Sequence, residues 1–123
     1  MRKTLACLTA LAFGRTVALG PTTAMAEDWQ PRDAPAITLA LTARTVAYDD
    51  GATQGFNEDA STIYTTTHPS IGAWRVERDQ YCPQWPPSDR WSCYDVALSA
   101  DGLDLRFTAG DGSVSVGRYV DLR

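Results

Sequence analysis

The sequence predicts a mainly β domain, all-β or with one short N-terminal helix, folded as a small antiparallel meander that closes into a barrel or forms a sandwich. Three observations lead to this fold class. Apolar and polar residues alternate along most of the chain after Arg44, which is the period of a half-buried strand. Asp-Gly pairs, which are typical of hairpin turns, separate several of these runs. Cys82 and Cys93 are positioned to close one loop with a disulfide.

The N-terminus has the pattern of a secretory signal peptide, predicted over residues 1–26. Two basic residues are followed by the apolar stretch LACLTALAF, and Ala24-Met25-Ala26 is a small-x-small cleavage site. A membrane-spanning helix needs about 20 apolar residues, and Arg15 interrupts this stretch early. We therefore expect cleavage near Glu27, a periplasmic or secreted protein, and no stable membrane insertion.

Cleavage would make the chain strongly acidic. The 11 basic residues would fall to 8 while all 15 acidic residues remain, so the net charge would become −7, with no lysine left. An acidic surface repels nucleic acids and anionic membranes, so neither is an expected partner. The remaining 97 residues are enough for one domain.

The segment that would follow the cleavage site has two prolines and few apolar residues. We interpret residues 27–35 as a flexible lead-in and residues 36–123 as a single β domain. Residues 36–43 favour a short helix because they are rich in Ala and Leu, and Asp33 is suited to cap it. Ile37, Leu39 and Leu41 also alternate with other residues, which leaves a strand open as an alternative.

About seven short strands follow, joined by tight turns. β-branched residues dominate one of them, STIYTTT, and His68-Pro69-Ser70 is expected to break the chain after it. The final strand is expected to bend at Gly117. The predicted strands span residues 45–48, 53–56, 61–67, 72–78, 91–98, 103–108 and 114–120.

The disulfide-closed loop is the candidate binding surface. Once Cys7 leaves with the signal peptide, Cys82 and Cys93 are the remaining pair, and an oxidising compartment favours their disulfide. Closing a loop of this length stabilises a fold by about 3 kcal/mol. If the strands at 72–78 and 91–98 are neighbours, the two Cα atoms should lie about 5.5 Å apart. The loop presents stiff prolines and large aromatics, which lose little entropy on binding. The candidate surface residues are Trp85, Pro86, Pro87, Arg90 and Trp91.

An alternative use of the two loop tryptophans stays open, because large aromatics are often buried. Trp85 and Trp91 would then close one end of the barrel instead of contacting a partner.

No catalytic, metal-binding or cofactor-binding residues are predicted. His68 is the single histidine and lies in a predicted exposed turn, whereas a general base needs a positioned partner. Both remaining cysteines are assigned to the disulfide. The aspartates of the Asp-Gly turns lack the alternating spacing of a calcium loop. We therefore expect no cofactor, and the chain is more readily interpreted as a non-enzyme.

Several short motifs lie along the β region: Arg44-Thr45-Val46-x-Tyr48-x-x-Gly51, Gly72-x-Trp74-x-Val76, Tyr81-Cys82, Trp91-x-Cys93-Tyr94 and Asp111-Gly112-Ser113. Together they resemble a group of small, uncharacterised periplasmic proteins of Gram-negative bacteria, some of which carry the label dihydrodipicolinate reductase. The resemblance implies export and a disulfide-bonded β domain. The reductase label is not supported by this sequence: no G-x-G-x-x-G motif for a nicotinamide cofactor occurs, since Ser115 takes the third glycine position after Gly110 and Gly112.

These observations favour a non-catalytic periplasmic module that binds a small ligand or an envelope protein. The mouth of a barrel is a suitable place for a small apolar ligand. The alternatives are an inhibitor or accessory factor that presents the Trp-Pro-Pro loop to an envelope protein, and a small enzyme of unknown reaction.

Overall fold

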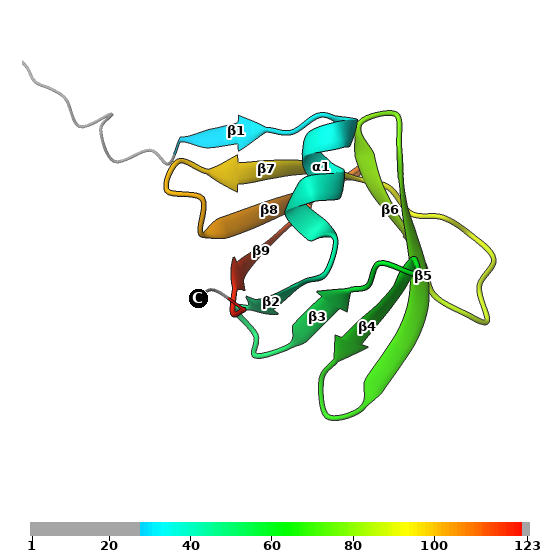
Figure 1. The fold of residues 1–123 in the computed structure, drawn as a ribbon. Helices are drawn as coiled ribbons and strands as arrows, with labels where there is room; N and C mark the ends of the chain where they lie inside the picture. The colour runs from blue at the N-terminus through cyan, green and yellow to red at the C-terminus, as the bar shows by residue number, and fades with distance from the viewer. Residues whose placement is uncertain (1–27, 122–123) are drawn as a thin grey trace, which may run out of the picture.

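The structure is a computed structural model that describes residues 28–121 (Figure 1). The predicted signal peptide, residues 1–26, lies outside the described residues. One short helix and nine strands occur within the described part of the chain. They are β1 (Trp29–Pro31), α1 (Ala34–Leu41), β2 (Arg44–Tyr48), β3 (Thr53–Phe56), β4 (Ser61–Thr65), β5 (Pro69–Glu77), β6 (Gln80–Gln84), β7 (Tyr94–Ser99), β8 (Asp104–Ala109) and β9 (Val114–Tyr119).

Strands β2 to β9 form a closed antiparallel barrel of eight strands. Each strand pairs with the next one along the chain, and β9 returns to pair with β2. The fold class predicted from the sequence is confirmed, and of the two architectures left open the barrel is the one formed. Closure removes the exposed sheet edges that an open meander of this size would leave.

Helix α1 closes one end of this barrel, in front of the strands in Figure 1. The carboxylate of Asp33 accepts a hydrogen bond from the Ala36 amide at 3.1 Å, so the predicted cap is confirmed. Ile37 and Leu41 have no exposed surface, because they point into the barrel end. The Tyr119 hydroxyl donates to the Ala40 carbonyl at 2.7 Å and joins the helix to the end of β9.

The core is built from the inward-facing residues of the strands. The Phe56 ring lies near its centre, with ring centroids 5.9 Å from Trp74, 5.5 Å from Tyr81 and 6.4 Å from Phe107. Burial of each such side chain contributes about 1.5–3 kcal/mol. The strand predicted over residues 53–56 is observed with those same ends, because Gln54 and Phe56 alternate inward while Gly55 faces out.

Three hairpins of the barrel turn at the predicted Asp-Gly pairs. Gly51, Gly102 and Gly112 adopt positive φ angles of 92, 77 and 90°, a conformation that glycine tolerates without steric cost. In each turn the aspartate carboxylate accepts a backbone N–H two residues further on, at 2.9–3.0 Å. The turn aspartates are therefore used to fix the hairpins.

One seam interrupts the barrel, between β6 and β7. These strands pair at a single position, Tyr81 with Tyr94. The rest of that edge of β7 is covered by β1, which pairs from Trp29 opposite Ser99 to Pro31 opposite Ala97. The segment predicted as a flexible lead-in therefore contains a strand of the sheet, and the interpretation of residues 27–35 as lying outside the domain was wrong.

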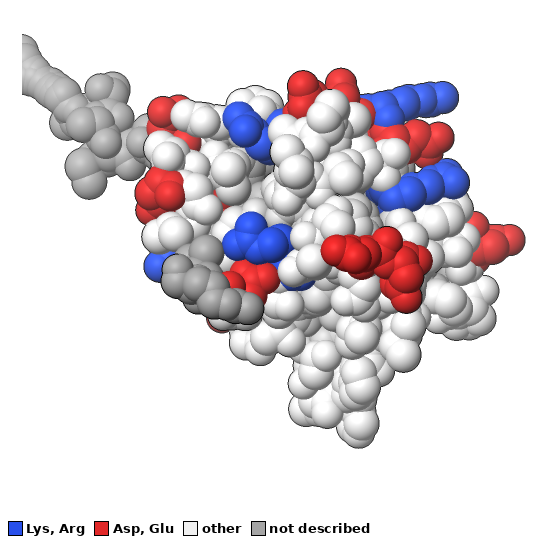
Figure 2. All heavy atoms as spheres, in the orientation of Figure 1, with Lys and Arg blue, Asp and Glu red and all other residues white. Residues whose placement is uncertain are grey.

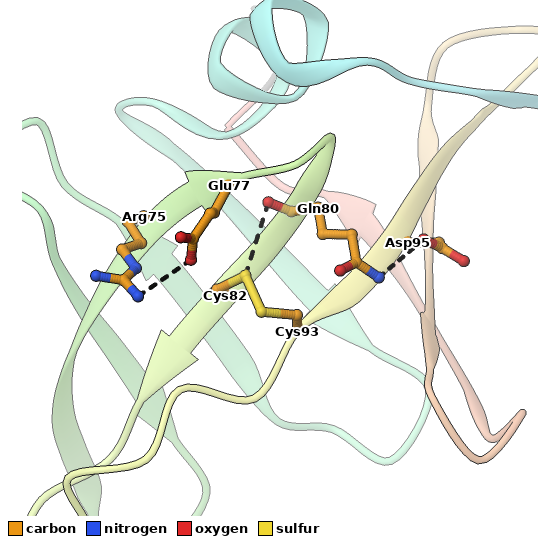
Figure 3. The surroundings of a disulfide bond; sticks show 6 residues. All are labelled: Arg75, Glu77, Gln80, Cys82, Cys93 and Asp95. Atoms are coloured by element: carbon orange, nitrogen blue, oxygen red, sulfur yellow. Dashed lines mark hydrogen bonds and ion pairs between the residues drawn. A yellow bond between two sulfur atoms is a disulfide. The ribbon is translucent and has the colours of Figure 1, made fainter.

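The disulfide Cys82–Cys93 crosses this seam and is formed as predicted (Figure 3). Beside it, the Gln80 amide donates to the Asp95 carboxylate at 3.0 Å, a second side-chain link between β6 and β7. The Cα atoms lie 4.1 Å apart, closer than the predicted 5.5 Å. The condition behind that distance is not met: the strands at 72–78 and 91–98 are not neighbours, because β6 lies between them and brings Cys82 beside the start of β7.

Most of strand β6 lies in the segment that was interpreted as the disulfide-closed loop, and it contains Pro83. Proline normally argues against a strand that pairs on both sides. Here the Pro83 carbonyl accepts from the Ser92 amide at 3.0 Å. The carbonyl and nitrogen of one strand residue point to the same side, so the Pro83 nitrogen faces the seam, where no regular ladder needs a donor.

The outer surface carries mixed charge. Figure 2 shows acidic and basic side chains interspersed over the face that α1 covers. The β4–β5 hairpin is different, since residues 61–74 contain no charged residue, and its tip is uncharged at the bottom of the same view. Within the described residues, no helix is long and apolar enough to span a membrane.

Candidate ligand-binding site

A cavity of about 420 Å³ opens at the end of the barrel opposite α1. Most of its lining comes from the places where β2, β4 and β6 end and where β7 and β9 begin, and Gln54, Tyr81 and Phe107 complete it. Helix α1 occupies the other end, where β2 begins and β9 ends. The barrel therefore has one filled end and one hollow end.

Six aromatic rings line this cavity in an unbroken arc. Neighbouring ring centroids are 5.4–6.3 Å apart along the series, the usual spacing of interacting aromatic pairs. Each ring comes from a different strand or loop, so the arc exists only because the barrel is closed. In order, the rings are Trp85, Tyr64, Tyr48, Phe107, Tyr81 and Tyr94.

The base of the cavity is a buried hydrogen-bond network centred on Gln54, which is only 4% exposed. Its carbonyl oxygen accepts from the Tyr48 hydroxyl at 2.6 Å. Its amide donates to the Thr62 hydroxyl and to the Tyr81 hydroxyl, each at 2.9 Å. The Thr62 hydroxyl in turn donates to the Gly55 carbonyl at 2.7 Å. The network joins β2, β3, β4 and β6 and holds two of the cavity tyrosines in place.

The cavity tyrosines at this network stay protonated. Burial raises the pKa of Tyr48 far above its ordinary value of 10.0, and the nearby Tyr81 and Asp50 raise it further. Burial also raises the pKa of Tyr81, although the hydrogen bond from Gln54 opposes this shift. Both side chains therefore act as neutral phenols that keep their hydrogen-bond geometry.

The rim of the cavity is acidic on one side. Asp49 and Asp50, in the β2–β3 turn, are both among the lining residues and are exposed. Val114, Ser115 and Val116 of β9 lie along the rim as well. No residue of the lining carries a positive charge, so the mouth has a negative potential that attracts cations.

Two glycines allow the aromatic wall to pack. A β-carbon at Gly72 would lie 2.5 Å from the Gln84 carbonyl oxygen and 2.6 Å from the Trp85 ring. A β-carbon at Gly117 would lie 3.2 Å from the Tyr48 ring. The rings of Trp85 and Tyr48 thus occupy the space that a side chain at position 72 or 117 would need.

The five residues of the binding surface predicted from the sequence do not lie together in the structure. Trp85 is half-buried and lines the cavity, with its ring centroid 6.1 Å from that of Tyr64. Trp91 is also half-buried, but it packs on the outer face, where the Arg75 guanidinium lies 4.1 Å above its ring. Pro86, Pro87 and Arg90 are exposed on the loop between them. Of the five predicted surface residues, only Trp85 belongs to the cavity.

Most of the cavity residues were not singled out in the sequence. Tyr48, Tyr64 and Tyr94 each occupy an alternating strand position, and their aromatic character is equally compatible with an ordinary core. The clearest available signal was Gln54, a polar residue in the inward series of strand 53–56. A buried amide requires hydrogen-bond partners, and its position marks the level of the barrel at which the apolar core stops.

His68 takes no part in this site. It lies exposed in the β4–β5 turn, where its Nδ1 is 3.2 Å from the Thr67 hydroxyl. Within residues 28–121, no group of three or more His, Cys, Asp or Glu side chains is arranged to hold a metal ion. The chemistry that the cavity offers is therefore aromatic contact, hydrogen bonding from neutral phenols and the charge of two carboxylates.

Comparison of the chain with protein-family models, with curated proteins and with solved structures found no match. The function is therefore inferred from the geometry and chemistry of the cavity, since a small barrel supports many unrelated functions.

Proposed function

We propose that this protein is an exported binding module that holds a small molecule in the open end of its barrel. The observation that carries the proposal is the cavity of about 420 Å³ with its arc of six aromatic rings. Its volume lies in the range of about 300–1,000 Å³ that is typical of ligand sites. Tyr and Trp rings supply a large contact area with few rotatable bonds, so little entropy is lost on binding.

The geometry of the site supports binding because it is organised before a ligand arrives. Gln54 fixes the hydroxyls of Tyr48 and Tyr81 through hydrogen bonds of 2.6 and 2.9 Å. Trp85 is seated against Gly72 and Tyr64. A site whose side chains are already ordered avoids the cost of ordering them on binding.

Export is the second part of the proposal. The Cys82–Cys93 disulfide indicates an oxidising compartment, and the N-terminal pattern described above is that of a secretory signal. Together these features support a periplasmic location.

A second candidate function is the presentation of the disulfide-closed loop to an envelope protein. The observation that favours it is the exposure of Pro86, Pro87 and Arg90 at the tip of that loop. Prolines restrict the backbone, so such a loop loses little entropy when a partner binds.

The experiment that tests the cavity is a fragment screen observed by two-dimensional NMR on the mature protein. We expect fragments to shift the resonances of Tyr48, Tyr64 and Phe107, and Tyr64→Ala to abolish these shifts. Ile63→Ala is the matched control, because Ile63 is the preceding residue of β4 and faces outward with 37% of its surface exposed. Denaturant melts of both variants establish that they are folded.

Fragment shifts confined to the exposed loop around Pro86 and Pro87 would favour the second candidate function. A screen in which no fragment perturbs the cavity resonances of the folded protein would overturn the first.

A further inference from the structure

We infer that the ligand of the cavity is an organic cation, a small molecule with an alkylated ammonium group. This inference rests on the ligand-binding function proposed above and names the chemical class of the ligand. It follows from three features of the cavity: the inclination of its rings, its acidic rim, and the positions of the arginines elsewhere in the fold.

The aromatic rings form a curved wall and not a flat platform. Along the arc from Trp85 to Tyr94, successive ring planes are inclined to one another by 65, 51, 56, 58 and 33°. A flat ligand would be matched best by one coplanar aromatic surface. Rings inclined to one another present several negative faces to a rounded group, which is the arrangement that recognises quaternary ammonium ions.

The charge of the lining matches the same ligand. Asp49 and Asp50 supply two carboxylates at the mouth, and no Arg or Lys is among the lining residues. The turn hydrogen bond from the Ala52 amide to Asp50, 3.0 Å long, holds that carboxylate at the rim. An anionic ligand would meet this negative charge without any compensating cation from the protein.

The protein's own arginines leave the cavity rings free for a ligand cation. Among the described residues, three guanidinium groups lie over aromatic rings: Arg44 over Tyr119, Arg75 over Trp91 and Arg106 over Trp29. None of these three rings lines the cavity. The rings that line it instead surround open space next to two carboxylates.

The decisive experiment compares choline with its uncharged carbon analogue, in which a tert-butyl group replaces the trimethylammonium group. The two probes have nearly the same shape, so a difference in affinity reports on the charge. Titration calorimetry of the mature protein at low ionic strength should show choline binding and the analogue binding about ten-fold more weakly or worse. Added salt should weaken choline binding, because part of the attraction comes from exposed carboxylates.

Variants separate the contributions of the carboxylates from that of the fold. Asp49→Asn combined with Asp50→Asn removes both charges while the amide oxygen at position 50 still accepts the turn hydrogen bond. This double variant should bind choline several-fold more weakly and leave the affinity for the analogue unchanged. Asp101→Asn is the matched control: Asp101 accepts the equivalent turn bond from Leu103 at 3.0 Å, but it lies outside the cavity lining. Its choline affinity should equal that of the wild type.

The outcomes distinguish this inference from the broader proposal. Equal affinity for choline and its analogue, or binding of neutral sugars in place of choline, would overturn the organic cation while leaving a ligand site in the cavity. Unchanged choline affinity in the Asn double variant would likewise overturn it. If neither probe binds and the fragment screen also leaves the cavity resonances unperturbed, both the inference and the proposed function fail.

Discussion

Gln54 is a buried amide on β3 whose hydrogen bonds reach three other strands. It accepts from Tyr48 on β2 and donates to Thr62 on β4 and Tyr81 on β6. A buried polar group without partners costs stability, whereas a fully bonded one fixes the geometry around it. Gln54 therefore separates the apolar core, on the side of α1, from the cavity at the open end of the barrel. It also orients the two phenols that line the base of the cavity.

The Tyr48 hydroxyl provides the first test of this network. Tyr48→Phe keeps the ring but leaves the Gln54 carbonyl oxygen without this donor inside the barrel. We expect the free energy of unfolding to fall by about 1–3 kcal/mol, the cost of an unsatisfied buried group. Denaturant melts measure the change. Tyr64→Phe is the control, because the Tyr64 hydroxyl takes no part in the Gln54 network, and it should change stability by much less. Equal melts for Tyr48→Phe and wild type would show that the network is not stabilising.

The raised pKa values of Tyr48, Tyr81 and Tyr119 predict a loss of stability in alkaline solution. Burial is the main cause in all three. In the unfolded chain these phenols ionise near the ordinary pKa of 10.0, while the folded protein keeps their protons. Their contribution is therefore complete below about pH 10 and is lost as the pH rises above it, because the unfolded chain then binds fewer protons.

Unfolding free energies measured on both sides of about pH 10 test this prediction. Tyrosinate absorbance of the folded protein should show Tyr48, Tyr81 and Tyr119 keeping their protons above the pH at which an ordinary tyrosine ionises. Tyr48→Phe should reduce the slope of stability against pH, since one of the shifted groups is removed. Ionisation of Tyr48, Tyr81 and Tyr119 near the ordinary pKa in a protein that remains folded would contradict the prediction.

At the level of the elements, the seam between β6 and β7 is the weakest junction of the barrel. One ladder pair, Tyr81 with Tyr94, joins the two strands. The disulfide and the hydrogen bond from Gln80 to Asp95 supplement it. The covalent link therefore holds the barrel closed at the point where the backbone hydrogen bonds are fewest.

Replacing both cysteines by serine tests this role. We expect the free energy of unfolding to fall by about 2–4 kcal/mol while the folded fraction retains its secondary structure. Amide exchange in β6 should accelerate more than in β3, because β6 borders the seam. Denaturant melts, together with a thiol titration of native protein, provide the measurement. Two free thiols in the native protein, or a double variant as stable as the wild type, would refute the proposed role.

Gly72 tests how the loop tryptophan is held against β5. In Gly72→Ala the new methyl group would lie 2.5 Å from the Gln84 carbonyl oxygen and 2.6 Å from the Trp85 ring, so β6 and Trp85 must move. We expect a loss of about 1–3 kcal/mol, as for other overpacked sites, and a shift in tryptophan fluorescence.

Gly55→Ala is the matched control for this substitution. Gly55 faces outward on β3, and the nearest atom to a methyl group introduced there would be Thr45 Oγ1 at an ordinary 3.6 Å. Its fluorescence should equal that of the wild type. A normal spectrum in a stable Gly72→Ala protein would contradict the close packing of Trp85.

For the whole molecule, the arrangement is a barrel with one end closed by α1 and the other open as an aromatic cavity. Ile37 and Leu41 at the closed end are fully buried. A ligand would therefore enter and leave through the mouth that carries Asp49 and Asp50. Because the strands around this mouth are fixed by closure of the barrel, the proposed binding would require no folding step.

Export is the prediction that concerns the whole chain. Expressed from Met1 onward in a Gram-negative host, the protein should be recovered from the periplasm with an N-terminus near Glu27. The basic start, the apolar stretch and the Ala24-Met25-Ala26 site are the reason. Subcellular fractionation combined with N-terminal mass spectrometry measures both properties. A cytosolic protein that keeps Met1 would refute it.

The strands and turns were predictable because their signals are local. Alternation at Leu105 and Phe107 and the turn at Asp111-Gly112 depend on neighbouring residues only, and each is observed where it was expected. Strand β6 was not predicted. Its Pro83 is tolerated within a strand only because the nitrogen of Pro83 faces the seam, which no local pattern reveals. Strand β1 was hidden as well, since its three residues gain their pairing from β7.

The sequence by itself determined a mainly β meander with Asp-Gly hairpins and a disulfide, and it favoured a capped helix, because propensity, turn conformation and cysteine pairing are encoded over short stretches of chain. Tertiary structure alone decided that the meander closes as a barrel, that β1 covers the seam, and that Trp85 faces the cavity while Trp91 packs outside. It also assembled the aromatic arc. Those rings are separated by up to 59 positions, from Tyr48 to Phe107, and closure of the barrel is the physical event that brings them around one space.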